Sequence, residues 1–452
     1  MALTEVQRQR AVHGTRDKKS AAIGAAVGTC VENYDFLAYG TASALYFGTA
    51  FFPGADPLVG TLLSFATLGV GFAMRPLGGI IGGYLGDKIG RKPVLVAALL
   101  VMGLATFAIG LLPTYQTVGV LAPILLVSVR VIQGVAFGAE WGGAILMAYE
   151  HAPWRHRGRY SAIPTAGNPA GVFLANIVFL FSVHLGGEWA WRVPFLASAV
   201  LVIAGLIIRA RVSESPEFED VKDRGETAKN PLLKVLKDDW RNLLRVIGLR
   251  LVESAGFYVV VTYILSYISG LDADLREVGL VGLCIATAIG VGSSLFWGDL
   301  TDKFGRKPIY LVGSILSIAF GFPMFLMLNS QVPVLIVFVY VIGLPLIHDM
   351  LAGTQGAWFS ELFSTDTRSS GASIGYQLAA AISGFIPFIA TALAAAIGWG
   401  GVSLLYVAAG VVGVVTVLLT RETWSRKERA YVDEVTSAVP TAVVDPRVAN
   451  QS

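Results

Sequence analysis

The stretch Gly83-Tyr-Leu-Gly-Asp87-Lys-Ile-Gly90-Arg91-Lys92-Pro93 decides the fold, because the chain repeats it. The second copy runs from Gly298 to Pro308, 215 positions later, and keeps the first glycine, the Asp-Lys pair and the Gly-Arg-Lys-Pro end. Each copy closes one long apolar segment and opens another. We therefore expect each to be a short charged hairpin between two membrane helices, and the duplicated hairpin indicates a duplicated half.

The hairpins are candidate gates. Glycines before the first hairpin let a neighbouring backbone approach closely, and Asp87 stands where a carboxylate can face Arg91 and the positive N-terminus of an adjoining helix. A charge cluster of this kind can hold one conformation and release it in another. The expected gating residues are Gly83, Asp87, Gly90, Arg91 and Lys92 in the first copy and Gly298, Asp302, Gly305, Arg306 and Lys307 in the second.

A weaker second repeat supports the two halves. Glu150 stands seven residues before Arg157, and Glu361 stands seven before Arg368, at an offset of 211. A carboxylate and an arginine bracket many loops, so this spacing gains weight only beside the first repeat. We add these four residues to the expected gates.

Composition places the chain in a membrane. Of its 452 residues 54% are hydrophobic and only 14% are charged, far fewer than the roughly one quarter typical of soluble domains. The two cysteines, Cys30 and Cys284, lie in apolar segments without metal-ligand spacing, so neither a disulfide framework nor a metal site is indicated. The net charge of +3 is distributed by loop and forms no patch for nucleic acid.

Twelve apolar segments are long enough to span a bilayer. Of the 34 lysines and arginines, 29 fall on the side of the N-terminus when loops are assigned alternately, which predicts cytoplasmic termini and a multi-pass protein of the cell (plasma or inner) membrane. The expected spans are 20–48, 58–83, 93–112, 118–149, 160–184, 190–209, 243–269, 276–299, 308–328, 333–359, 370–396 and 399–420.

The spans define an all-α membrane protein of two six-helix bundles. We expect a linker with a surface helix over 231–240, and no coiled coil in the C-terminal tail. The predicted divisions are a cytosolic tail 1–19, a first bundle 20–209, a cytosolic linker 210–242, a second bundle 243–420 and a cytosolic tail 421–452.

Together with the doubled hairpin, several strings resemble the major facilitator superfamily and, within it, the metabolite:proton symporters. They are Arg75-Pro-Leu-Gly, Arg130-Val-Ile-Gln-Gly, Gly138-Ala-Glu-Trp-Gly-Gly-Ala, Trp191-Arg-Val-Pro-Phe, Glu214-Ser-Pro, Trp358-Phe-Ser-Glu-Leu-Phe and Ser370-Gly-Ala-Ser. The resemblance implies the major facilitator fold and proton-coupled uptake of small organic acids or zwitterions by alternating access. It implies no cofactor beyond the coupling proton.

One position departs from that family. Its fifth helix usually offers a Pro-Gln pair, whereas here Thr165 follows Pro164. A shorter side chain is expected to face the cavity, so substrates that are read by the glutamine are in doubt. The absence of a coiled coil likewise argues against the osmosensing branch that carries proline and betaine.

Ionisable groups inside a span are costly, so each is a functional candidate. In 20–48, Glu32, Asp35 and Tyr39 share one helix face, and a buried carboxylate is suited to carry a proton. In 118–149 a polar face holds Arg130, Gln133 and Glu140. Arg130 could bind Asp35 when that group is ionised and a substrate anion when it is protonated, an exchange that the resemblance also implies. The alternative is a fixed Asp35–Arg130 pair that only joins two helices.

Further candidates for substrate contact lie in other spans. Arg75 is a second anion contact or a snorkelling surface group, and Arg250 and Glu253 either satisfy each other or line the cavity with Tyr258. His348 and Asp349 are adjacent, so only one is expected to face the lumen, and a lone histidine is as often a satisfied core residue as a relay. The remaining expected substrate contacts are Tyr39, Arg130, Gln133 and Thr165.

These patterns favour a monomeric organic-acid:proton symporter whose partners are the solute, the proton and the bilayer. A betaine or proline symporter and a proton antiporter that exports a metabolite or drug remain alternatives. An enzyme is disfavoured, since the chain has no His-Glu-x-x-His, Gly-x-Ser-x-Gly or phosphate-loop motif.

Overall fold

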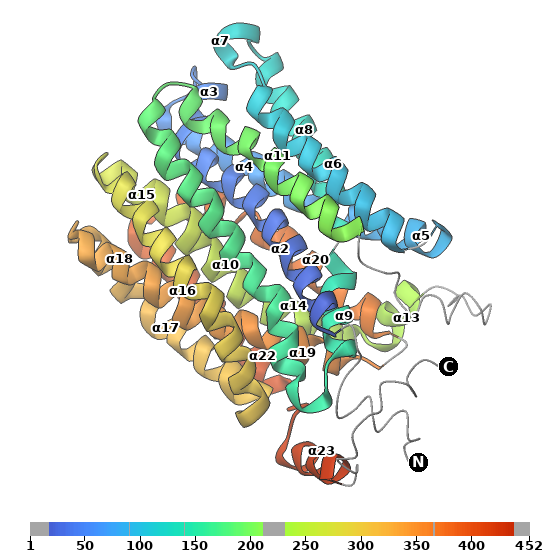
Figure 1. The fold of residues 1–452 in the computed structure, drawn as a ribbon. Helices are drawn as coiled ribbons and strands as arrows, with labels where there is room; N and C mark the ends of the chain where they lie inside the picture. Colours follow the sequence, from blue (N-terminus) through green and yellow to red (C-terminus); the bar gives the residue numbers. More distant parts are fainter. Residues whose placement is uncertain (1–17, 90, 140, 211–230, 365–366, 438–452) are drawn as a thin grey trace.

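The computed structural model is built of helices throughout its described residues, which are 18–89, 91–139, 141–210, 231–364 and 367–437. The helices run roughly side by side along one long direction (Figure 1). Short α7 and α3 lie at one end of the bundle, and α23 lies at the other. We call the end at which Gly305 joins α16 to α17 the hairpin end.

The first half of the chain contributes helices up to α11. Proline at the start of α4 suits the first turn, where no backbone donor is needed, and Asp56 caps that turn by accepting from Leu58 N at 2.9 Å. The elements are α2 (Lys18–Ala42), η1 (Ser43–Phe47), α3 (Gly48–Phe51), α4 (Pro57–Ala73), α5 (Arg75–Ile89), α6 (Arg91–Leu111), α7 (Tyr115–Val118), α8 (Leu121–Gly138), α9 (Trp141–His151), η2 (Trp154–His156), α10 (Arg157–Ser182), η3 (Val183–Leu185) and α11 (Trp189–Ala210).

The second half begins after the linker. Gly305, with φ of +104°, makes the sharp turn of the second hairpin, a conformation that favours glycine. The elements are α13 (Pro231–Asp238), α14 (Trp240–Tyr258), η4 (Val259–Tyr263), α15 (Ile264–Leu271), α16 (Leu275–Phe304), α17 (Arg306–Asn329), α18 (Pro333–Val341), η5 (Ile342–His348), α19 (Asp349–Leu362), α20 (Arg368–Ser383), α21 (Ile386–Ile397), α22 (Trp399–Leu419) and α23 (Arg426–Ser437).

Several predicted spans are interrupted. The span predicted at 118–149 is divided into α8 and α9, and the one at 370–396 into α20 and α21. At the second break Gly384 lies against the ring of Phe72, where a Cβ would come within 2.3 Å of that side chain. Wide π-helical turns, η4 and η5, sit in the middle of two further spans. Such turns often occur at functional sites.

Ten helices in the described residues are long and apolar enough to cross a membrane. The predicted span 93–112 falls short of that measure because its apolar helix is Val96–Leu111. The helix that begins with α2 carries Glu32 and Asp35, which lower its hydropathy. Ten spans are therefore found in the described residues where the sequence predicts twelve. The other two predicted spans contain a helix that is too short or too polar to be counted by length and hydropathy.

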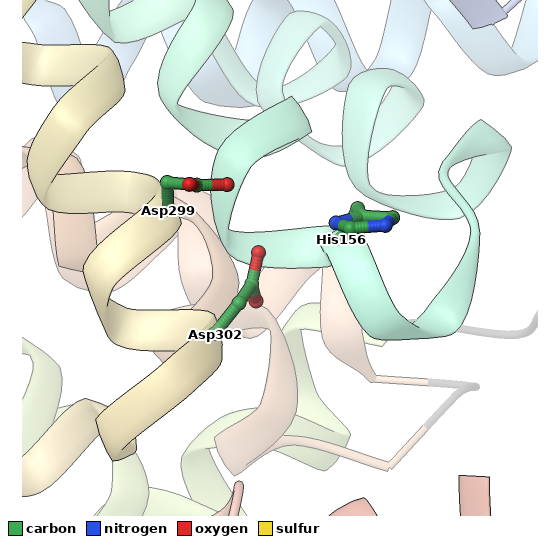
Figure 2. A group of neighbouring side chains, drawn as sticks. All are labelled: His156, Asp299 and Asp302. Atoms are coloured by element: carbon green, nitrogen blue, oxygen red, sulfur yellow. The ribbon is translucent and has the colours of Figure 1, made fainter. Parts of the chain in front are cut away.

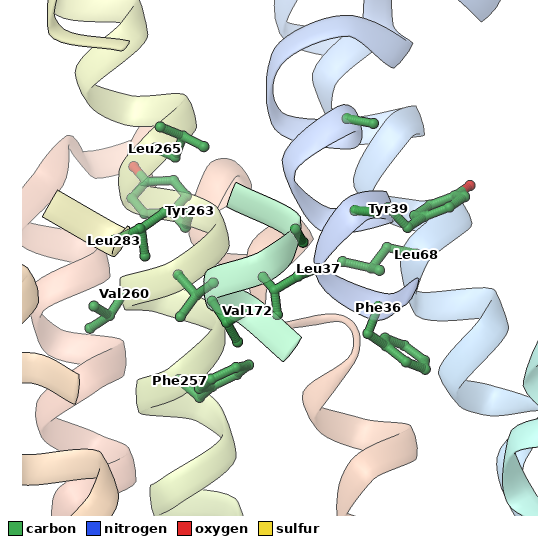
Figure 3. Packing of buried hydrophobic residues seen from close by; sticks show 14 of the residues in the cluster. Phe36, Leu37, Tyr39, Leu68, Val172, Phe257, Val260, Tyr263, Leu265 and Leu283 are labelled. Carbon is green, nitrogen blue, oxygen red and sulfur yellow. The ribbon is translucent and has the colours of Figure 1, made fainter. Parts of the chain in front are cut away.

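Close packing of α10 joins the two halves. It packs against α2 on one side and against α16 and α19 on the other. Figure 3 shows Val172 of α10 between Leu37 of α2 and Phe257 of α14, within one buried apolar cluster that continues into both halves. Small residues permit this approach, since a Cβ on Gly298 would meet Ala162 at 2.4 Å.

The linker and the C-terminal tail are described in part. The linker residues 231–238 form a helix, α13, whose place on the membrane surface stays a prediction. Most of the linker (211–230) lies outside the described residues, as do residues 1–17 of the first tail. The second tail was predicted only as a cytosolic extension. It forms α23, and the segment before it folds back onto the hairpin end.

Candidate functional site

A cavity lies between the two halves and is lined by both. It holds about 920 Å³ of space not filled by atoms, part of it open to solvent. Its charged lining residues in the described part of the chain are three arginines and two glutamates, and aromatic rings form much of the remaining wall. The charged residues are Arg75, Arg250, Arg368, Glu32 and Glu253, and the rings are Phe36, Phe137, Phe257, Tyr258, Phe359 and Tyr376.

On the first-half wall Arg75 pairs with Glu32, with 3.6 Å between guanidinium and carboxylate. Its guanidinium carbon also lies 3.3 Å from the centre of the Phe137 ring. Arg75 is 3% exposed, so the snorkelling alternative is wrong and the charge stays inside the protein. A guanidinium stacked on rings keeps its edge free to receive a planar anion.

On the second-half wall Arg250 is the centre of a polar cluster. It bonds Glu253, and it donates to Gln355 at 3.1 Å and to the Tyr376 hydroxyl at 2.7 Å. The two alternatives for Arg250 and Glu253 therefore hold together, since the residues pair with each other and both line the cavity. Because three separate groups orient it, the guanidinium is held in one position.

Behind this wall the cluster continues to the histidine. The Glu253 carboxylate lies 2.8 Å from His348 Nε2, and His348 Nδ1 lies 2.9 Å from Asp349 Oδ1. Asp349 also bonds the Ser293 hydroxyl of α16. His348 and Asp349 do not line the large cavity, so the structure places them behind the predicted substrate contacts.

The predicted pair of Asp35 and Arg130 is not in contact with this cavity. Both side chains are fully buried and neither belongs to its lining. Arg130 bonds Gln133 and stacks over Tyr39 at 4.1 Å, and Asp35 lies close enough to act on its charge. Arg130 also packs beside Gly71, where a Cβ would meet its side chain at 2.5 Å.

Some of the other predicted substrate contacts line the cavity and some do not. Thr165 and Tyr258 line the cavity as expected. Gln133 donates to Thr106 at 2.7 Å, and the Tyr39 hydroxyl bonds Thr67 at 2.6 Å, so both are occupied elsewhere. Glu140 lies outside the described residues.

At the hairpin end Asp302 joins the two halves. It accepts from the backbone N–H groups of Gly158 and Arg159 at the start of α10, at 2.8 and 2.9 Å, and pairs with Arg306 at 2.8 Å. Arg306 also reaches Glu361 at 3.1 Å. A carboxylate at a helix N-terminus is stabilised by the dipole and by unpaired N–H groups, so this contact has the form expected of a gate.

The first hairpin is less fully described. Gly90 lies outside the described residues, and the structure gives no side-chain surroundings for Gly83, Asp87, Arg91 and Lys92. In the second, Lys307 Nζ donates to the Thr420 carbonyl at 2.9 Å.

The Glu-x6-Arg repeat produces a shared contact. Arg157 of α10 and Arg368 of α20 both lie over the ring of Tyr149, at 4.5 and 5.5 Å. Arg157 also donates to the Tyr149 hydroxyl at 3.1 Å. Glu361 bonds Arg306, so the two repeats meet in one network. Glu150 is the neighbour of Tyr149 in the last turn of α9.

His156, Asp299 and Asp302 form the only group in the described residues that has metal-ligand geometry (Figure 2). The Asp302 oxygens already accept two backbone N–H groups and Arg306. Asp299 lies 3.5 Å from Lys303 and 3.8 Å from Arg159. Surrounding positive charge opposes cation binding at this group.

Some site residues were missed by sequence reasoning. Gln355 and Tyr376 orient Arg250, and Asn168 contributes an amide to the cavity. Each is a polar group within an apolar span, which is the signal that could have identified it. In the tail, Glu422 accepts from the N–H groups of Arg306 and Lys307 at 3.1 and 3.0 Å.

The chain is similar to known proteins over most of its length. The family model described as Major Facilitator Superfamily matches residues 59–386 and again 293–449. The chain belongs to this superfamily. It is 39% identical over 416 residues to the shikimate transporter of Escherichia coli, covering 89% of this chain and 94% of that protein. To the proline/betaine transporter of Salmonella typhimurium it is 34% identical, covering 82% and 77%.

These similarities place the chain among the metabolite:proton symporters, and they make it a multi-pass inner-membrane transporter and not an enzyme. Solved structures agree on the fold. A structure of the xylose transporter XylE from E. coli superimposes with a TM-score of 0.70 at 19% identity, covering 91% of this chain and 100% of that chain. The predicted resemblance and the major facilitator fold are thereby confirmed.

Proposed function

We propose that this transporter takes up a small cyclic monocarboxylic acid together with a proton, by alternating access between two six-helix halves with cytoplasmic termini. The observation that supports it is the charge balance of the cavity, whose described lining has three arginines against two glutamates. One unmatched positive charge suits a monoanion better than a dicarboxylate or a zwitterion. Flat aromatic walls suit a ring.

The polar lining adds to this specificity. Thr165, Asn168, Gln355 and Ser373 offer hydroxyl and amide groups that can bond the hydroxyls of a solute ring. Shikimate, the solute named for the 39% identical relative, is a hydroxylated cyclic monocarboxylate. It is therefore the first probe.

The two glutamates of the cavity wall would couple solute binding to a proton. Glu32 forms an ion pair with Arg75, and Glu253 forms one with Arg250. A solute carboxylate that replaces either glutamate leaves a buried carboxylate without its arginine, and protonation removes that cost. We also keep Asp35 of α2 as a proposed proton carrier. It is buried in the first half of the chain and does not line the cavity.

The test is uptake by the purified chain in proteoliposomes. With an inward proton gradient, radiolabelled shikimate is expected to accumulate, and an uncoupler is expected to abolish the accumulation. Succinate and glycine betaine serve as competitors. Strong competition by betaine alone would favour the zwitterion alternative, to which the proline/betaine relatives point, and shikimate efflux driven by proton entry would favour antiport.

A further inference from the structure

Glu253, His348 and Asp349 form a line of bonded titratable groups that runs away from the cavity. Glu253 lies on the cavity wall, His348 lies behind it and Asp349 follows, with contacts of 2.8 and 2.9 Å. All three are nearly inaccessible, with exposed fractions of 2%, 4% and 2%. We propose that this line, the relay, carries the transported proton in the second half of the chain, an inference that rests on the proposed symport.

The two short contacts fix the number of protons. Each ring nitrogen of His348 faces a carboxylate oxygen. Each of these two contacts is a hydrogen bond only if a hydrogen lies between the nitrogen and the oxygen. A neutral imidazole supplies only one N–H. The observed geometry therefore requires a second proton, either on the imidazole or on one carboxyl group. That second proton is the one that can leave.

The charges of the neighbourhood lead to the same result. Arg250 contributes one positive charge and Glu253 and Asp349 two negative ones, so the relay with Arg250 is neutral only when the second proton is present. Among the described elements packed on η5, α14 presents Glu253 and Arg250, α16 presents the Ser293 hydroxyl, and α19 begins with Asp349. Burial of net charge in a membrane is costly, which favours the loaded form.

The relay connects two voids. Glu253 borders the large cavity, whereas His348 and Asp349 line a second, smaller void that is also bounded by Thr287 and Gly290. Asn168 and Phe257 belong to both linings. His348 therefore borders a void that is distinct from the solute cavity.

Arg250 links this proton to the solute. A carboxylate that binds Arg250 competes with Glu253, and it brings one extra negative charge next to the relay. The relay then holds its protons more tightly, and by reciprocity a loaded relay binds the anion more tightly. Solute and proton are carried together because each raises the affinity for the other.

The test compares two assays in the same proteoliposomes with labelled shikimate: exchange at equal pH, and accumulation under an inward proton gradient. Asp349→Asn keeps the charge of the loaded relay, so it is expected to retain exchange and to lose accumulation by about tenfold or more, since exchange needs no proton release. His348→Gln is expected to lose accumulation as well, and to exchange only at a higher shikimate concentration. His184→Gln, at an exposed histidine outside the relay, is the control and should retain both. Accumulation at the wild-type ratio in both relay variants would overturn the proposal.

Failure of the proposed function has a different result. If wild-type vesicles neither exchange nor accumulate shikimate, the solute assignment fails, and the relay is judged by infrared difference spectra of the purified protein between acidic and alkaline pH. A titrating imidazole or carboxyl signal that is lost in His348→Gln and kept in His184→Gln supports it. A spectrum unchanged by His348→Gln contradicts it. If His348→Gln does not fold, the same infrared difference spectrum is recorded on Asp349→Asn.

Discussion

Asp302 of α16 accepts a hydrogen bond of 2.8 Å from the backbone N–H of Gly158, at the first turn of α10. The bond crosses from the second half of the chain to the first. It is made by the aspartate of the repeated hairpin, which gives a physical reason for the motif: the acid binds a helix start and the following arginine neutralises it.

Asp302→Asn removes the charge from this contact. The amide offers a single acceptor oxygen and removes the charged partner of Arg306, so we expect the free energy of unfolding to fall by about 1–3 kcal/mol. Thermal unfolding in detergent should show a lower Tm. Asp299→Asn, three residues earlier and partly exposed, should change Tm little. Equal Tm values for Asp302→Asn and the wild type would contradict the gate.

Gly138→Ala tests the close packing of α8 on α5. A Cβ there would lie 1.9 Å from the Arg75 carbonyl oxygen, a backbone atom that cannot move without the helix. We expect a destabilisation of about 1–3 kcal/mol, typical of overpacking. Gly292→Ala has nothing within 4 Å and should be neutral or slightly stabilising, because alanine favours the helix. Tm measurements on both variants check the contrast.

Arg250→Lys keeps the charge of the cavity wall and removes the planar fork. Lysine cannot bond Gln355, Tyr376 and a carboxylate in the same geometry. We expect the apparent KM for shikimate to rise about tenfold or more, since charge-assisted hydrogen bonds contribute about 1.5–3 kcal/mol. Arg241→Lys, at an exposed arginine beside Trp240, is the control. An unchanged KM would remove Arg250 from the substrate site.

Asp35→Asn tests the carrier proposed in α2. The variant cannot release a proton, so shikimate accumulation under the proton gradient should fall to the level reached without it. Asp274→Asn, an exposed aspartate before α16, should accumulate normally. Full accumulation by Asp35→Asn would leave the relay of the second half as the proposed proton site.

The sequence was sufficient for the fold because its signals are local. The repeated hairpin, the long apolar segments and the family strings all lie within short stretches of chain. The helix breaks in the middle of spans were missed; at one of them Gly384 packs against Phe72, a contact between segments that are far apart in sequence.

The site was predicted less well for the same reason. Spacing identified Asp35, Arg130, Arg250 and Glu253 as intramembrane charges, but which of them faces the cavity depends on neighbouring helices. Arg130 lies outside the cavity lining and packs beside Gly71, which has no side chain to exclude it. His348 looked like a lone histidine because its partner Glu253 is 95 residues away.

The most direct measurement is proton movement caused by the solute alone. Shikimate is added outside lightly buffered proteoliposomes that have no initial pH or electrical gradient, and the external pH is followed. We expect prompt alkalinisation outside, abolished by an uncoupler and absent with Arg250→Lys at the same low solute concentration. Shikimate entry without any change in external pH would contradict linked transport of the acid and the proton.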